Sequence, residues 1–239
     1  MKRFAAILAG LTLGSAVTVL AGEATAVSIA TNGGRASSNA TAIGNARSLA
    51  VAGATRGGRA VANSTARGRG RGFADSRSVA MSDRGLAISH ANADALGIFG
   101  GRALADSESI AATIGGLAVS NSAARADGVF RGRAISRSTS TALSHRGAAF
   151  SDSRAVSRGL LGGRATSVSD SLSNTSRGRA VSRVSAISDA GYRARAQADG
   201  IGISISGRLR HSRANVHAES RAQRFGRAQA RSALIWVRR

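Results

Sequence analysis

The chain has neither cysteine nor proline, and only 3% of its residues are aromatic. Without cysteine there are no disulfides and no thiolate metal sites, so stability must come from backbone pairing or from assembly. The residues that make up the hydrophobic 43% are mainly Ala rather than Leu, Ile or Phe. Because Ala buries little apolar area, a conventional core of large interlocking side chains is not expected.

Lysine and acidic residues are also scarce. Lys2 is the only lysine among 34 basic residues, the acids number 12, and the formal net charge is +22. The planar Arg side chain binds phosphate, sulfate and carboxylate groups through a fork of donors. The charge therefore predicts a polyanionic partner, such as acidic polysaccharide, lipopolysaccharide or extracellular DNA. The alternative interpretation is a charged surface that keeps a β-rich protein soluble.

The N-terminal segment 1–26 is typical of a bacterial secretory signal peptide. Lys2 and Arg3 precede a mostly apolar stretch, and small-residue cleavage signals end at Ala21 and at Ala26. A membrane anchor is the alternative, but the stretch is short and interrupted by Gly. No second apolar run of spanning length follows. We therefore expect an exported protein, secreted or at the cell surface, with no integral membrane span after the signal is removed.

A repeat of 31 residues dominates the rest of the chain, in three consecutive copies at 85–115, 116–146 and 147–177. Ala, Ser or Gly occupies nearly every second position, as in Ala103, Ala105, Ser107, Ser109 and Ala111. In a strand such positions share one face, whereas a helix would scatter them. Low complexity and high charge also fit a disordered chain, but disorder requires no strict alternation.

Pairs of Gly, or of Arg and Gly, divide each repeat into two strands, and the parity of the small residues changes at 115/116, 146/147 and 177/178. The sequence thus predicts an all-β fold. It is a parallel β-solenoid of about 31-residue, two-strand layers with an Ala/Ser/Gly interior. Antiparallel hairpins remain the alternative. We expect four segments: the signal peptide 1–26, degenerate repeats at 27–84, regular repeats at 85–206, and a degenerate repeat with a C-terminal cap at 207–239.

Residues 31 apart match on the predicted outward face. In a parallel stack each series becomes a ladder with rungs about 4.8 Å apart. An Arg ladder repels itself and needs counter-anions, neighbouring acids or extended solvation, which makes it the candidate polyanion-binding site. Its members are Arg71, Arg102, Arg133, Arg164 and Arg195. A second series is apolar: Ile88, Val119, Phe150 and Val181.

The segment Leu234, Ile235, Trp236 and Val237 is the densest apolar patch after the signal. It is predicted either to cap the open end of the stack or to insert into a neighbouring subunit.

Catalytic and metal sites are not expected. Ser is abundant as repeat filler, and the four His residues show no ligand spacing. His90 is replaced by Asn121, Asp152 and Arg183 at the equivalent position of successive repeats, which indicates an outward position without a fixed role. The acids are scattered singly, without the nine-residue period of calcium-binding rolls. We expect no cofactor and no enzymatic activity.

The alternating small residues in two-strand layers resemble the subunits of bacterial functional amyloids such as curli fibres. They are also similar to the Ala/Ser/Gly-rich head repeats of trimeric autotransporter adhesins. The resemblance is architectural and implies no functional residue. The chain departs from the curli pattern in its longer period and in lacking Gln/Asn ladders.

Stacked layers with open ends can add subunits. The sequence therefore predicts a secreted structural protein that self-associates into an extracellular fibre, matrix or surface layer such as a biofilm matrix. The alternative is a monomeric, Arg-rich adhesin for a polyanion.

Overall fold

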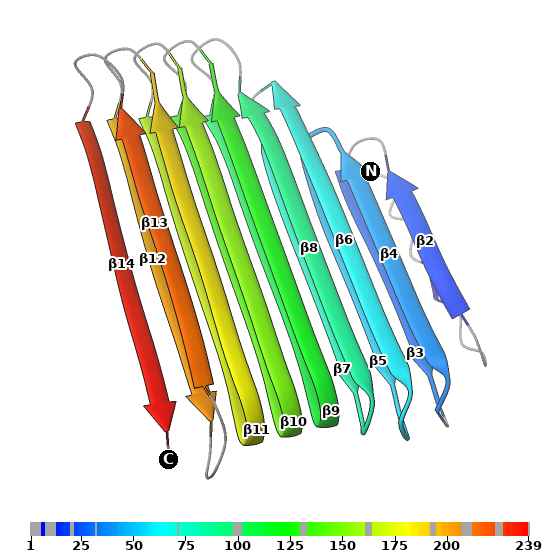
Figure 1. Cartoon of the computed structure of the whole chain (residues 1–239). Helices are drawn as coiled ribbons and strands as arrows, with labels where there is room; N and C mark the ends of the chain where they lie inside the picture. The colour runs from blue at the N-terminus through cyan, green and yellow to red at the C-terminus, as the bar shows by residue number, and fades with distance from the viewer. Residues whose placement is uncertain are drawn as a thin grey trace.

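The computed structural model describes residues 6–7, 13–19, 22–31, 33–70, 72–97, 102–129, 133–160, 164–191, 195–206, 212–222 and 227–238. Every regular element in these ranges is a β-strand. Figure 1 shows the strands stacked side by side from β2 to β14. The fold is a parallel β-solenoid, as the alternation predicts.

The described residues form fourteen strands of the stack. The short ones are β1 (Ala6–Ile7), β2 (Leu13–Val19), β3 (Gly22–Ala30), β4 (Arg35–Ile43), β5 (Ala46–Ala54), β6 (Arg59–Gly70), β7 (Phe73–Ser82) and β8 (Leu86–Gly97). Three long ones follow: β9 (Arg102–Gly128), β10 (Arg133–Gly159) and β11 (Arg164–Ala190). The last are β12 (Arg195–Ser206), β13 (Ser212–Ala222) and β14 (Arg227–Arg238).

Two parallel arrays of strands face each other. The first sheet runs β1-β3-β5-β7-β9-β10-β11-β12-β14. The second contains β2, β4, β6 and β8, then the C-terminal arms of β9, β10 and β11, and finally β13. The three long strands bend at Gly116, Gly147 and Gly178 and so contribute one arm to each sheet.

The register confirms the predicted period. Arg133 pairs with both Arg102 and Arg164, and Arg164 pairs with Arg195, so each step is one repeat of 31 residues. Earlier layers are shorter: Ala46 pairs with Gly22, a step of 24 residues. At the C-terminal end Arg195 pairs with Arg227, a step of 32. The spacing therefore drifts along the stack while the rows stay aligned, which is why residues 27–84 look irregular in the sequence.

The interior consists mainly of Ala, Ser and Gly, with a few larger residues such as Thr113 and Val184. In β9 the buried positions are odd-numbered from Ala103 to Thr113 and even-numbered from Ala118 to Gly128, so the parity changes at the 115/116 bend as predicted. The change keeps the small side chains inside both sheets.

Buried Ser hydroxyls bond across the two sheets. Ser109 Oγ donates to the Ser89 carbonyl at 2.8 Å, Ser120 Oγ to the Ser109 carbonyl at 2.6 Å, and Ser140 Oγ to the Ser120 carbonyl at 2.6 Å. The hydroxyls thus form a series of hydrogen bonds along the stack. These bonds satisfy polar groups that would be costly to bury unpaired.

Candidate functional site

The predicted Arg ladder runs along the edge of the first sheet where β9 to β12 begin. Arg102, Arg133, Arg164 and Arg195 are successive register partners, and all four are exposed. Arg71 lies outside the described residues. Arg227 on β14 extends the ladder by one rung. Arg227 does not follow from the 31-residue period, because the step to it is 32 residues.

No ion pair joins these arginines to a carboxylate in the described part of the chain. The residues outside the described ranges contain no Asp or Glu. Among the described residues no carboxylate pairs directly with these guanidinium groups, and successive groups repel one another across rungs of about 4.8 Å.

A groove of about 660 Å³ lies beside the C-terminal half of the ladder. Arg164, Arg195 and Arg227 line it together with the next outward row, Thr166, Gln197 and Gln229. Guanidinium groups and neutral hydroxyl and carboxamide groups thus share one surface. Such a surface can bind the charged groups of an extended anion and hydrogen-bond its neutral polar groups.

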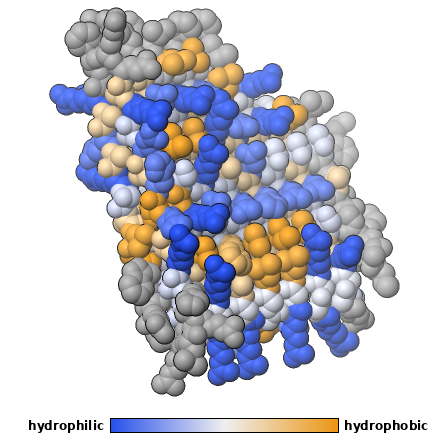
Figure 2. Space-filling model, viewed as in Figure 1, coloured by the Kyte–Doolittle hydropathy of each residue, from blue (hydrophilic) through white to orange (hydrophobic). Residues whose placement is uncertain are grey.

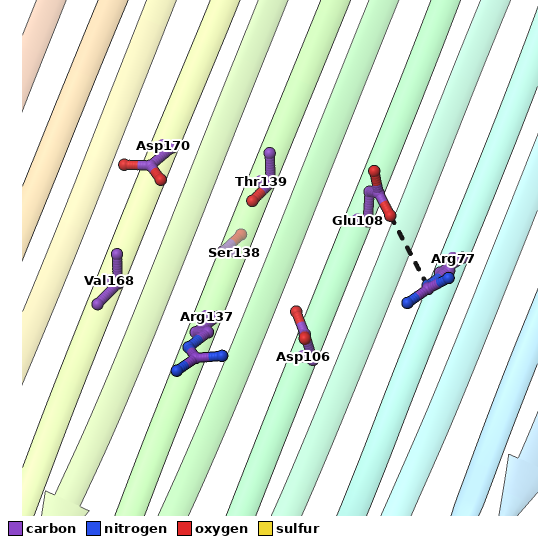
Figure 3. Close-up of a pocket in the computed structure, with 8 residues that line it drawn as sticks. All are labelled: Arg77, Asp106, Glu108, Arg137, Ser138, Thr139, Val168 and Asp170. Atoms are coloured by element: carbon purple, nitrogen blue, oxygen red, sulfur yellow. Dashed lines mark ion pairs between the residues drawn. The ribbon is translucent and has the colours of Figure 1, made fainter.

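A second hollow, of about 270 Å³, lies in the middle of the same sheet face. Figure 3 shows acidic and basic side chains from neighbouring strands around it: Arg77 on β7, Asp106 and Glu108 on β9, Arg137 on β10 and Asp170 on β11. Arg77 pairs with Glu108 at 3.7 Å. Asp106, Arg137 and Asp170 form no ion pair within the described residues.

Burial raises the pKa of two carboxyl groups in this hollow. It raises the pKa of Asp106, an effect that the charge of Asp75 increases and that of Arg137 opposes. Burial also raises the pKa of Asp170, and Asp199 adds to that shift. Both carboxylates are therefore less stable as anions than free aspartate, and a cation beside them would be favourable.

The outer face of the second sheet is mixed. The predicted apolar series is confirmed as one row, with Ile88, Val119, Phe150 and Val181 in register. Figure 2 shows apolar and charged patches alternating over the surface. Position 90 faces outward as predicted, and burial lowers the pKa of His90.

Two contacts between neighbouring layers on this face involve Asn side chains. Asn63 Nδ2 donates to Asn39 Oδ1 at 2.8 Å, and Asn121 Nδ2 lies 3.1 Å from His90 Nδ1. The Asn39–Asn63 pair does not follow from the 31-residue period, because those residues are 24 apart.

The C-terminal apolar segment lies on β14, the last strand of the first sheet. Leu234 and Ile235 are register partners of Gly202 and Ile203, and about half of each side chain is exposed. The backbones of Trp236 and Val237 continue the pairing with Ser204 and Ile205.

No protein-family model, curated protein or solved structure matches this chain. Within the described residues no group of three or more His, Asp or Glu side chains is arranged to hold a metal ion. The same residues include no helix long and apolar enough to cross a membrane.

Proposed function

We propose that this chain is a secreted structural protein whose solenoids stack end to end into a fibre, matrix or surface layer. The observation that carries the proposal is the open C-terminal end of the stack. β14 and β13 are the last strands of their sheets, and nothing in the described chain pairs with their outer edges. An exposed strand edge offers unpaired backbone groups to a further strand.

The side chains at this end support addition of another layer. Leu234 occupies the same inward row as the buried Ser140 and Ser171, yet remains exposed. A following subunit would cover it and gain the burial of a large apolar side chain. In this proposal the C-terminal segment is an assembly surface rather than a closed cap.

Replacement of Leu234 by Lys tests the proposal. A charge at this inward position would have to be desolvated when a second solenoid stacks on it, so we expect filaments to disappear. Electron microscopy and thioflavin fluorescence of the refolded mature chain provide the measurement. Ala233→Lys is the matched control, because it adds the same charge to the adjacent outward position of the same strand. Equal filament formation by both variants would contradict the proposal.

Export is part of the same proposal, and the position of β3 supports the first of the two cleavage signals. Removal of residues 1–21 would leave β3 complete, because the strand begins at Gly22. Cleavage after Ala26 would remove the buried Ala24 and Ala26 and half of the strand. We therefore expect N-terminal sequencing of the exported protein to begin at Gly22; a start at Val27 would be the contrary result.

A second candidate function, binding of a polyanion, is favoured by the unpaired Arg ladder and its groove. Neutralising two rungs with Arg164→Gln and Arg195→Gln should weaken binding of heparin and reduce its dependence on salt concentration. The control removes two arginines from a row that also contains acids, through Arg158→Gln and Arg221→Gln. Equal losses in both variants would indicate nonspecific attraction to net charge.

A further inference from the structure

The outer face of the first sheet carries an ordered pattern of charge. We define the Asp106 row as the outward residues in register with Asp106, taken from the N-terminal end of the stack. They are Glu23, Arg47, Asp75, Asp106, Arg137, Val168, Asp199 and Arg231. The neighbouring Glu108 row is Thr25, Leu49, Arg77, Glu108, Thr139, Asp170, Ile201 and Ala233.

Each row is complementary to the same row read in the opposite direction. Read from opposite ends, the Asp106 row pairs Glu23 with Arg231, Arg47 with Asp199 and Asp106 with Arg137, and it places no like charges opposite each other. The Glu108 row pairs Arg77 with Asp170 and Leu49 with Ile201 under the same reversal. A surface that matches its own reversal is what a two-fold symmetric interface requires.

The next row on this face is almost entirely aliphatic. From β3 to β14 the Ile110 row consists of Val27, Val51, Val79, Ile110, Thr141, Leu172, Ile203 and Ile235. These eight residues carry no charge. Reversal therefore brings aliphatic side chains together, which supplies apolar burial beside the charged rows.

We propose that two copies of this chain pair face to face through their first sheets, about a two-fold axis that is parallel to the strands and passes between β9 and β10. The axis exchanges β9 with β10, β7 with β11, and β5 with β12. It crosses the hollow of Figure 3, so Arg137 of each copy meets Asp106 of its partner, and Arg77 meets Asp170. Two aligned sheets pack at a separation of about 10 Å, which side chains of this size can fill.

Unsatisfied groups within one chain support this arrangement. Asp106, Arg137 and Asp170 lack ion-pair partners among the described residues, and Asp170 Oδ1 has no hydrogen-bond partner there. Pairing supplies a partner of opposite charge to each. The Arg ladders of the two copies would meet at the rim of the interface, where exposed side chains can separate and salt screens their repulsion.

The pairing differs from end-to-end stacking and can be tested separately. The measurement is sedimentation equilibrium of the soluble mature chain carrying Leu234→Lys, which is designed to block end-to-end growth. We expect a dimer from this parent protein. Asp106→Arg would face Arg137 of the partner, and Arg137→Asp would face Asp106, so each single variant should dissociate at least about tenfold more readily.

Two rescue experiments separate face pairing from folding defects. The double variant Asp106→Arg/Arg137→Asp should again be a dimer, because both contacts are restored with reversed charges. An equimolar mixture of the two single variants should form a heterodimer, although each alone is mainly monomeric. A mixture that remains monomeric, or single variants that dimerise as well as the parent, would overturn the proposal. Filament formation by the wild-type chain reports on end-to-end stacking and is independent of these outcomes.

Discussion

Glycine at the inner bend sets how closely successive layers can approach. Gly85, Gly116, Gly147 and Gly178 stack in register at the point where the chain passes from the first sheet to the second. A Cβ on Gly147 would overlap the carbonyl oxygen of Gly116, and the φ of Gly147 is 147°. Both the space and the backbone conformation therefore exclude a side chain here.

Gly147→Ala is accordingly expected to lower the free energy of unfolding by about 3 kcal/mol, at the upper end of the usual cost of overpacking. Gly53→Ala is the control, because a Cβ there would meet nothing within 4 Å. Denaturant unfolding of both variants gives the comparison. A tolerated Gly147→Ala would mean that the layers are not spaced as described.

The raised pKa of Asp152 predicts that the stability of the fold depends on pH. Burial raises its pKa above the ordinary 3.8, although Arg183 and Arg154 oppose the shift. The folded chain thus binds this proton more tightly than the unfolded chain, so stability falls as the pH rises from 3.8 through the higher folded value.

Asp152→Asn should remove this loss and also place an amide beside Asn121, its register partner. We expect the variant's gain in melting temperature over wild type to be larger at pH 7 than at pH 3. A gain that is the same at both values would rule out the titration of Asp152 as its cause. Because Asp152 is exposed to solvent, the effect should be modest.

The two faces of each strand accept different residues. Ser140 is fully buried and donates to the Ser120 carbonyl, whereas its neighbour Thr141 belongs to the outward Ile110 row. Ser140→Val should therefore lose the bond, overfill the interior and destabilise the protein by about 2–3 kcal/mol. Thr141→Val makes a comparable change outside and should be neutral or stabilising, since β-branched residues favour strands. Equal thermal unfolding of the two variants would contradict this assignment of faces.

The alternation of small residues predicted which face of each strand is buried, but not how exceptions are accommodated. Val184 and Val216 occupy inward positions of the second sheet, where the two preceding layers have Ser. Gly200 and Gly202 lie opposite: a Cβ on Gly200 would lie 3.0 Å from Val184 Cγ1, and one on Gly202 would lie 2.6 Å from Val216 Cγ2. The larger Val side chains are thus accommodated by Gly on the opposite sheet. These residues are not at equivalent positions of the repeat, so the compensation is visible only once the strands are paired.

At the scale of the whole molecule, the regular copies were enough to predict the solenoid, its two strands per layer and four rungs of the Arg ladder. The shorter N-terminal layers and the fifth described rung, Arg227, depend on the register between strands rather than on a fixed period. The charge complementarity of the Asp106 row was hidden for the same reason, because its members come from eight strands separated by unequal intervals.

In the regular part of the solenoid, residues one repeat apart lie side by side on adjacent parallel strands. Because the chain has no cysteine, two engineered cysteines can form only one intramolecular disulfide. Thr141→Cys/Leu172→Cys joins register partners on β10 and β11. Their Cα atoms should lie about 4.8 Å apart, inside the range of about 4.4–6.8 Å over which disulfides form.

The comparison pair is Thr141→Cys/Asp152→Cys, which an antiparallel hairpin turning at Arg146-Gly147 would place opposite each other. In the solenoid these residues lie on the outer faces of different sheets. Oxidation of the dilute mature protein, followed by mass spectrometry of the peptides, measures both disulfides. We predict rapid closure of the 141–172 disulfide and none between 141 and 152; the opposite result would replace the solenoid with stacked hairpins.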